Sequence, residues 1–299
     1  MKTVVSASRR TDIPAFYMTW LEERIQQGFV DVHNPVRKDQ SSHVCLRPES
    51  VHTLVLWSKN FHPFLQSSLA RNNQYRFYFQ FSLAHCPEWE PLVIPWQARI
   101  RQMQELSRRW SPPQINWRFD PIVFWDRGKQ SNMDSFLPIA DTCAAMGISH
   151  CTVSFVQWYA KVKKRIQPLA LQGYDPTLEE MQEHLARLAQ EAHDRGIQLC
   201  ICCQPELESV PHVHKARCID GPLLSHLAGE RCSHAQDSSQ RPGCGCTKSS
   251  DIGRYTMPCP HGCFYCYAQP GPTHTEQTPP IPILLMDETT QTGRKKEKL

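Results

Sequence analysis

Residues 177–203 read TLEEMQEHLARLAQEAHDRGIQLCICC, a helix pattern followed directly by a strand pattern. Thr177 and Glu180 have the spacing of a capping box, which favours a helix start. An apolar stripe with helical spacing follows, formed by Met181, Leu185 and Leu188. Gly196 supplies a C-terminal stop, and residues 198–203 then favour a strand. A helix that leads straight into a strand is typical of an α/β fold with a parallel sheet.

The same alternation extends over most of the chain. Short β-branched or aromatic runs predict six strands at residues 3–8, 53–58, 76–82, 115–119, 151–155 and 198–203. Four helices are expected at residues 14–27, 97–109, 133–145 and 177–195. A small hairpin is expected in the first connection, from residues 29–34 and 43–46. Six strands with intervening helices favour a partial (β/α)6 TIM-like barrel, although the periodicity also fits an open doubly wound sheet.

The composition is that of an ordinary globular protein, with 299 residues, of which 40% are hydrophobic and 21% charged. The net charge of +4 is too mild to indicate nucleic-acid binding by itself. No apolar stretch is long enough to cross a membrane, and the apolar run at the N-terminus is too short for a signal peptide. Of the 14 cysteines, ten fall between Cys200 and Cys266. That crowding favours metal ligation in a reducing compartment, so we expect a cytoplasmic protein without membrane contact.

The most specific motif is Cys259-Pro-His-Gly-Cys263-Phe-Tyr-Cys266, with the spacing C-x3-C-x2-C. Three thiolates on one loop can hold an iron–sulfur cluster of the [4Fe-4S] type and leave one iron without a protein ligand. An iron that has no protein ligand and lies beside a pocket can take part in a reaction. The alternatives are a zinc site, in which His261 would be the fourth ligand, and three thiols without a metal.

A second group of cysteines is expected to bind a further centre. Its ligands would be Cys218, Cys244 and Cys246, with Cys203 or Cys202 as the fourth. The C-x-C pair supplies two ligands to one metal, and Gly243 and Gly245 relieve backbone strain around it. Thiolates suit both iron–sulfur clusters and zinc. We favour a second iron–sulfur cluster, with zinc as the alternative.

These patterns divide the chain into three parts. Residues 1–210 are expected to form the partial α/β barrel, and residues 211–268 a cysteine-rich iron–sulfur segment that caps it. Residues 269–299 are Pro-rich and then basic, which predicts an extended, flexible tail.

Polar residues follow the expected strands at their carboxyl ends, where a parallel barrel builds its reaction cavity. After the first strand, Arg9 and Arg10 precede a helix start near Asp12, an arrangement that binds carboxylate or phosphate. The alternative is that Asp12 caps the helix and the arginines pair with acids. Lys59 follows an apolar strand, so it needs a partner and is a candidate anion or substrate contact. Otherwise Lys59 simply reaches solvent at the rim.

Two further rim positions have alternative roles. Arg118 and Asp120 lie two residues apart on one strand and share a face, so they can form an ion pair. If Asp120 faces the cavity instead, it can bind ribose hydroxyls or an ammonium group. Tyr159 either donates a hydrogen atom or a proton near a radical, or packs against its neighbours.

Four stretches together resemble an uncharacterised family of bacterial proteins with radical-SAM-like cluster cysteines near the C-terminus. They are residues 6–14 (SASRRTDIP), 57–60 (WSKN), 117–121 (WRFDP) and 244–268. The C-x3-C-x2-C spacing, with an aromatic residue before the third cysteine, is similar to that of radical S-adenosylmethionine (SAM) enzymes. The resemblance implies a [4Fe-4S] cluster on Cys259, Cys263 and Cys266 that cleaves SAM and generates a 5′-deoxyadenosyl radical on an unknown substrate. It also implies a reductant such as a flavodoxin or a ferredoxin.

The chain departs from the radical SAM superfamily in two ways. The cysteine loop follows the last expected strand instead of the first, and the Gly-Gly-Glu element that holds the SAM amino group is absent. Ser8, Arg9 or Lys59 would then contact SAM in its place. The candidate catalytic residues are Arg9, Lys59 and Tyr159. The candidate cofactor contacts are Ser8, Arg10, Asp12 and Asp120.

Two other functions fit the same residues. The chain could be an iron–sulfur or zinc binding protein with a structural or electron-transfer role. It could also be a radical SAM nucleic-acid repair enzyme resembling spore photoproduct lyase, which the rim arginines fit.

Overall fold

The computed structural model describes residues 1–33, 40–268 and 270–271, and its centre is one large parallel sheet. The strands of this sheet are β1 Thr3–Ala7, β4 Val51–Ser58, β5 Phe77–Ser82, β6 Ile115–Ile122, β9 His150–Phe155, β11 Gln198–Ile201, β12 Val213–Lys215 and β13 Ser250–Asp251. They lie in the order β12-β11-β9-β6-β5-β4-β1-β13, and each neighbouring pair is parallel. All six expected strands are confirmed.

The sheet has the sequential strand order of a βα barrel, but it has two edges. These edges are β12 and β13, so the described residues show no closure of a barrel. The expected partial TIM-like barrel is therefore supported only as a mixed α/β fold with an eight-stranded parallel sheet. Both edge strands come from residues 211–268, the segment expected to cap a barrel formed by residues 1–210.

Two small antiparallel sheets complete the strands. β2 Phe29–His33 pairs with β3 Ser41–Cys45, which confirms the expected hairpin. β7 Phe124–Trp125 pairs with both β8 Gln130–Ser131 and β10 Gly173–Tyr174.

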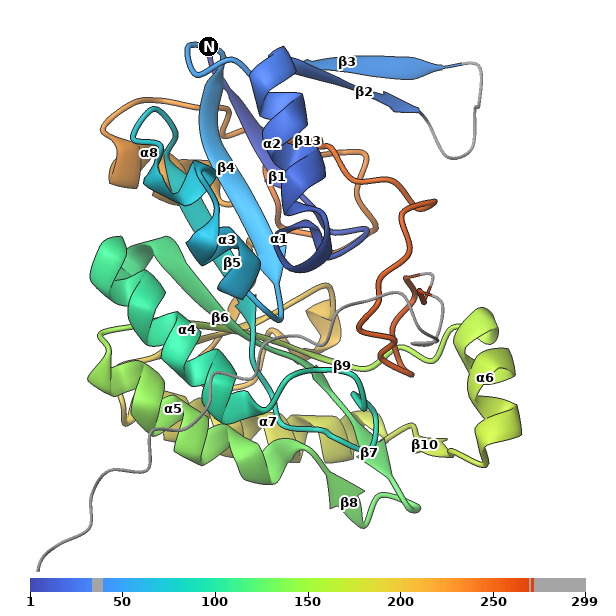
Figure 1. The fold of residues 1–299 in the computed structure, drawn as a ribbon. Helices are drawn as coiled ribbons and strands as arrows, with labels where there is room; N and C mark the ends of the chain where they lie inside the picture. The colour runs from blue at the N-terminus through green and yellow to red at the C-terminus, as the bar shows by residue number, and fades with distance from the viewer. Residues whose placement is uncertain (34–39, 269, 272–299) are drawn as a thin grey trace, which may run out of the picture.

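The helices connect the strands and cover the sheet (Figure 1). They are α1 Ile13–Phe16, α2 Met18–Gln27, α3 His62–Gln66, α4 Trp96–Arg109, α5 Phe136–Ala145, α6 Ala160–Ile166, α7 Leu178–His193 and α8 Gly221–Ala228. Short 3-10 turns lie at Leu69–Arg71, Pro112–Gln114, Met133–Ser135, Gln167–Leu169 and Pro205–Leu207. In residues 1–33, 40–268 and 270–271, no helix combines the length and the apolar character needed to pass through a bilayer.

The helix expected at residues 14–27 is two helices, because Tyr17 between α1 and α2 leaves the helical conformation. The other three expected helices are confirmed as α4, α5 and α7. The capping box of α7 is present, since Thr177 Oγ1 accepts a hydrogen bond from the Glu180 amide at 3.2 Å. The sequence reasoning did not identify α3, α6 or α8.

The sheet is buried on both faces, which is typical of parallel strands. Fully buried side chains follow one another from strand to strand, as in Val5, Leu56, Phe79, Trp117 and Val153. Each large apolar side chain buried in this way contributes about 1.5–3 kcal/mol relative to an exposed one. The sheet thus forms a rigid base for the loops at its carboxyl edge. The expected tail at residues 269–299 lies outside the described residues except for Pro270 and Gly271.

Candidate functional site

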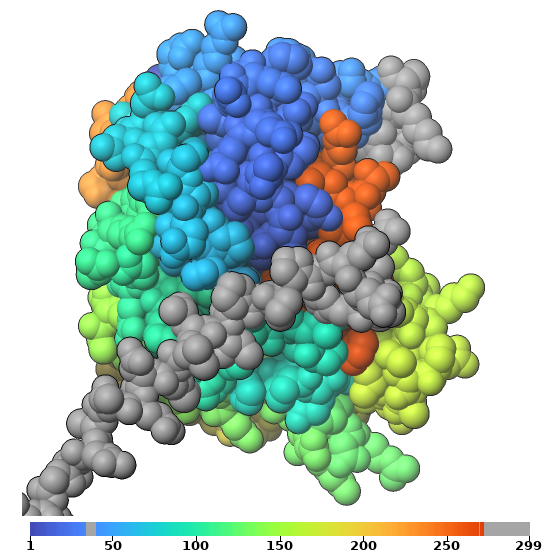
Figure 2. Space-filling model, viewed as in Figure 1, coloured from blue at the N-terminus to red at the C-terminus, as the bar shows by residue number. Residues whose placement is uncertain are grey.

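One cavity of about 970 Å³ lies at the carboxyl ends of the parallel strands. Its wall contains every residue that the sequence singled out as catalytic, cofactor-binding or metal-ligating. These are Ser8, Arg9, Arg10, Asp12, Lys59, Asp120, Tyr159, Cys203, Cys218, Cys244, Cys246, Cys259, Cys263 and Cys266. They meet because the carboxyl ends of parallel strands share one edge, and because the C-terminal segment folds back beside that edge. Figure 2 shows part of this segment in orange, between the blue N-terminal region and α6.

Cys259, Cys263 and Cys266 lie on one loop that faces the cavity. Burial raises the pKa of Cys259 to about 12, and it also raises the pKa of Cys263 and Cys266. Negative charge on a neighbouring sulfur of the loop also raises the pKa of Cys259 and Cys263. No hydrogen bond joins the three thiols in the described residues. Such buried thiols stay protonated at neutral pH unless a positive charge stabilises the thiolate. A bound metal would provide that charge.

Arg165 of α6 holds this loop in place. Its guanidinium donates to four backbone carbonyl oxygens of the loop, at 2.5–3.3 Å. These belong to Cys263, Phe264, Cys266 and Ala268. The planar fork of arginine can serve several acceptors at once, which the single ammonium of lysine cannot do in a fixed geometry. The loop conformation therefore depends on a helix almost a hundred residues earlier in the chain.

Asp12 fixes the other side of the loop. It caps α1 by accepting from the Ala15 amide at 3.0 Å, which confirms the capping alternative. It also accepts from Ser58 Oγ at 2.7 Å, from the Lys59 amide at 2.9 Å and from His261 Nε2 at 2.9 Å. The other ring nitrogen of His261, Nδ1, is buried and has no hydrogen-bond partner among the described residues.

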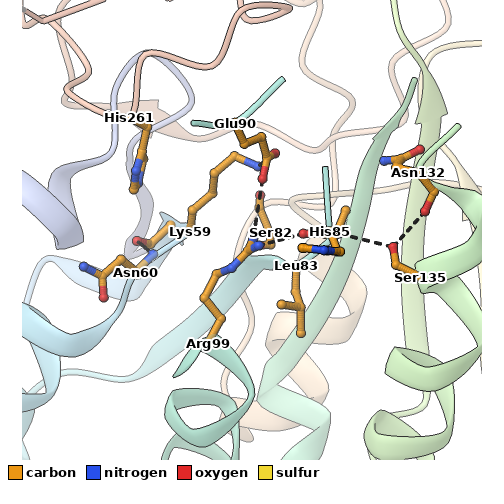
Figure 3. Close-up of polar contacts among 12 residues, drawn as sticks. Lys59, Asn60, Ser82, Leu83, His85, Glu90, Arg99, Asn132, Ser135 and His261 are labelled. Carbon is orange, nitrogen blue, oxygen red and sulfur yellow. Dashed lines mark hydrogen bonds and ion pairs between the residues drawn. The ribbon is translucent and has the colours of Figure 1, made fainter. Parts of the chain in front are cut away.

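Lys59 has the partner that its burial requires (Figure 3). Its Nζ lies 2.7 Å from Glu90 Oε1, and Arg99 Nη1 approaches Oε2 of the same carboxylate at 3.8 Å. Tyr265 donates a hydrogen bond to Glu90, so the pair is tied to the cysteine loop. Burial alone would raise the pKa of Glu90, but Lys59 and Arg99 outweigh burial and lower it. The ammonium of Lys59 is engaged in a buried ion pair, which corrects its interpretation as an available anion contact.

Asp251 engages two more candidates. It accepts from Ser8 Oγ at 2.6 Å and from the Arg9 amide at 2.9 Å, and Arg9 Nε lies 3.6 Å from its Oδ2. These bonds join β13 to the end of β1. The alternative in which the arginines pair with acids is therefore confirmed for Arg9, and Ser8 is occupied as well.

Arg118 and Asp120 form the ion pair that their spacing suggested. Ser154 donates to the other oxygen of Asp120, so neither carboxylate oxygen lacks a protein partner. Arg118 also donates to Cys218 Sγ at 2.9 Å. The pair thus connects the end of β6 to the second group of cysteines.

Five further cysteines line the same cavity. They are Cys202, Cys203, Cys218, Cys244 and Cys246. The sulfur of Cys202 lies 3.8 Å from that of Cys203 and 3.7 Å from that of Cys218. Hydrogen bonds from Cys203 and Cys246 lower the pKa of Cys244 to about 3, and those from Cys202 and Cys246 hold the pKa of Cys218 well below its usual range. We call this set the thiol ring.

Three exposed tyrosines stand at the mouth of the cavity, and we call them the tyrosine rim. They are Tyr159, Tyr255 and Tyr267, with exposed fractions of 40%, 46% and 38%. Arg10 lies over the ring of Tyr255 at 5.2 Å, Lys161 over that of Tyr267 at 5.6 Å, and Arg241 donates to the Tyr159 hydroxyl at 3.3 Å. In residues 1–33, 40–268 and 270–271, none of these three cations has a carboxylate partner. Tyr159 packs edge-on against Tyr267 with ring centres 6.3 Å apart, as the packing alternative expected.

Neither group of thiols is already arranged around a metal position. Among the described residues, no three His, Cys, Asp or Glu side chains converge as the ligands of one ion. Binding would require the cysteine side chains to rotate toward a common centre. Their chemistry suits such a centre, because thiolates select zinc and iron–sulfur clusters.

Sequence reasoning did not find several residues that organise the site, namely Glu90, Arg99, Arg165 and Asp251. Glu90 lies outside any predicted strand end, in a segment with prolines at 87, 91 and 95. Arg165 belongs to a basic run that reads as a solvated helix face. Only Asp251 had a signal, since it lies inside the stretch 244–268 that supported the family resemblance.

The chain belongs to the family described as Domain of unknown function (DUF1848), which matches residues 4–268. A search among curated proteins gave no match. Among solved structures, the chain is similar to the 1.8 Å crystal structure of an IOLI protein with a binding zinc atom, with 12% sequence identity and a TM-score of 0.32. That match covers 77% of this chain and spans 66% of the length of the other protein.

Proposed function

We propose that this member of the DUF1848 family is a radical SAM-type enzyme. The observation that supports the proposal is the loop of Cys259, Cys263 and Cys266, whose thiols face a cavity at the carboxyl edge of a parallel sheet. Three ligands are the number that leaves one iron of a cubane cluster open. When bound there, a [4Fe-4S] cluster would supply the electron that cleaves SAM and releases a 5′-deoxyadenosyl radical.

The protein contributes a fixed position for the three ligands. Arg165 binds four carbonyl oxygens of the loop, and Tyr17 donates to the Pro258 carbonyl at 2.5 Å. Tyr265 and His261 attach the same loop to Glu90 and Asp12. Ligands held from four sides keep their geometry, which is what a functional metal site requires of its supporting residues.

The cavity has room for a cofactor and a substrate. Its volume of about 970 Å³ is at the upper end of the roughly 300–1,000 Å³ found for ligand pockets. Arg9 and Lys59 are ion-paired with Asp251 and Glu90, so we assign the contact with the SAM carboxylate to Arg10 instead. Arg10 donates to the Gly253 carbonyl at 2.8 Å and has no carboxylate partner among the described residues.

The proposal includes the compartment and the electron source. All 14 cysteines are free thiols, which suits a reducing cytoplasm. Reduction of the cluster would need a small electron-transfer protein, such as a flavodoxin or a ferredoxin.

The test is anaerobic reconstitution with iron and sulfide, followed by SAM and dithionite. We expect about four irons at this loop and formation of 5′-deoxyadenosine. Cys263→Ala should lose those irons and the activity, whereas Cys45→Ala, which changes a thiol of the β2–β3 hairpin, should lose neither. Iron binding without any 5′-deoxyadenosine would refute the SAM chemistry and leave an electron-transfer protein. Zinc in place of iron at this loop would refute the cluster.

A second candidate function, radical SAM chemistry on a nucleic acid, is favoured by the tyrosine rim. Proteins bind single-stranded nucleic acid with exposed aromatic rings beside cations, because the bases stack on the rings and the phosphates contact the cations. Arg10, Lys161 and Arg241 supply such cations at the mouth of the cavity.

A further inference from the structure

The thiol ring has no part in the function proposed above, yet its five sulfurs line the same cavity. Cys202 and Cys203 follow β11, Cys218 follows β12, and Cys244 and Cys246 belong to the connection between α8 and β13. Three separate segments of the chain therefore bring cysteines to one place. Buried free cysteines are common singly, but five of them from three segments on one cavity wall need a cause.

The spacing of the sulfurs distinguishes a single ion from a cluster. In a tetrahedral site with metal–sulfur bonds of about 2.3 Å, neighbouring sulfurs lie about 3.8 Å apart. The sulfur of Cys202, a candidate fourth ligand, lies 3.7 Å from that of Cys218, close to this value. Ligands of a [4Fe-4S] cluster bind different irons and cannot touch one another. This pair of candidate ligands therefore favours a single ion, and the iron–sulfur cluster expected from the sequence stays the alternative that the test below distinguishes.

The backbone at the C-x-C pair is shaped for close approach. A Cβ atom on Gly245 would lie 2.5 Å from the Ala216 carbonyl oxygen, so only glycine lets this loop pack beside the end of β12. Gly243 has φ of +81°, which a side chain would strain. Cys203 itself has φ of +56°, an uncommon conformation for a residue other than glycine. The chain thus accepts local strain where the sulfurs converge.

Hydrogen-bond donors and positive charge accompany the ring. Four thiolates around a divalent ion leave a net charge of about −2. Arg118, which is also paired with Asp120, donates to Cys218 Sγ at 2.9 Å, and Arg241 acts on Cys203 through charge. The Ile219 amide adds a second donor, to Cys246 Sγ at 3.4 Å. Donors of this kind orient thiolate ligands and offset their charge.

We propose that the thiol ring binds a single divalent metal ion of the zinc class. Cys218, Cys244 and Cys246 are three of its ligands, and one thiol of the neighbouring pair Cys202 and Cys203 is the fourth. Cys202 and Cys218 are already in contact, and rotation of the other side chains would bring four sulfurs around one point. The site does not depend on SAM chemistry. It lines the same cavity as Cys259, Cys263 and Cys266, so a substrate bound in this cavity can contact both groups of cysteines.

The test is elemental analysis of the full-length protein purified without oxygen. We expect about one zinc per chain in the wild type, and its loss in Cys246→Ser with the iron content unchanged. Cys263→Ala should show the reverse, with iron lost and zinc kept. Cys200→Ser is the matched control, because Cys200 lies on β11 two residues before the ring and outside the cavity wall. The two losses separate this proposal from the proposed function.

A second measurement covers the case in which Cys246→Ser does not fold. Wild-type protein stripped of metal and titrated with Co²⁺ should show sulfur-to-cobalt charge-transfer bands and the intense visible bands of tetrahedral cobalt. Loss of about four irons and their sulfide in Cys246→Ser, with no zinc in the wild type, would show a cluster and overturn the proposal. Absence of both zinc and the cobalt bands in the folded wild type would overturn it as well.

Discussion

Glu90 is only 4% exposed and contacts Lys59, Arg99 and Tyr265. Glu90→Gln would leave two buried cations without a compensating charge. We expect this change to lower the free energy of unfolding by about 3–5 kcal/mol, measured by urea denaturation. Glu88→Gln, an exposed position two residues earlier, should change it by less than about 0.5 kcal/mol. Equal effects of the two changes would show that the buried ion pair does not stabilise the folded protein.

The same carboxylate predicts how stability depends on pH. The folded-state pKa of Glu90 is below its ordinary value, because Lys59 and Arg99 outweigh burial. Its stabilising contribution is therefore complete above the unfolded pKa of about 4.3 and is lost as the pH falls through the folded pKa. Below about pH 4.3, the unfolding free energy of the wild type should fall more steeply than that of Glu90→Gln. Parallel curves would contradict the assignment.

Helix α6 and the cysteine loop behave as one unit, because Arg165 connects them through four carbonyl oxygens. Arg165→Met should weaken retention of iron at the loop by about 10–100-fold, the usual effect of losing a supporting contact. The measurement is release of iron to a chelator after reconstitution. Arg187→Met, an exposed arginine on α7, is the control and should release iron as the wild type does. Unchanged release in Arg165→Met would show that the loop holds its shape without α6.

Elements with a local signal could be predicted, and those that depend on distant partners could not. The six inner strands, the hairpin and α7 have periodicity or caps in their own residues. β12 and β13 have only three and two residues, too few for any pattern, and they exist because β11 and β1 pair with them. The site divides in the same way. Strand ends and cysteine spacing predicted its wall, whereas the partners Asp251 and Glu90 came from contacts far along the chain.

The wall of the cavity carries more positively than negatively charged side chains. The cations on its wall are Arg9, Arg10, Lys59, Arg118, Lys161 and Arg241, and the carboxylates are Asp12, Asp120 and Asp251. The cations without a carboxylate partner among the described residues stand beside the tyrosine rim. A molecule that enters the cavity therefore meets aromatic rings and positive charge first. An anionic ligand with flat rings fits this entrance best.

Binding of single-stranded DNA tests this property of the molecule. If Arg10, Lys161 and Arg241 each meet a phosphate, the logarithm of the association constant should fall with the logarithm of salt concentration with a slope of about −2. Lys161→Met should make that slope about 0.7 less steep, and Lys164→Met, on the same helix but outside the cavity wall, should leave it unchanged.

Tyr255→Ala should weaken binding by about 1–3 kcal/mol at every salt concentration, because it removes a stacking surface and no charge. Fluorescence anisotropy of a labelled oligothymidine provides both readings. Equal responses of Lys161→Met and Lys164→Met would show that any attraction comes from the general charge of the protein, and would remove the reason to favour a nucleic-acid substrate.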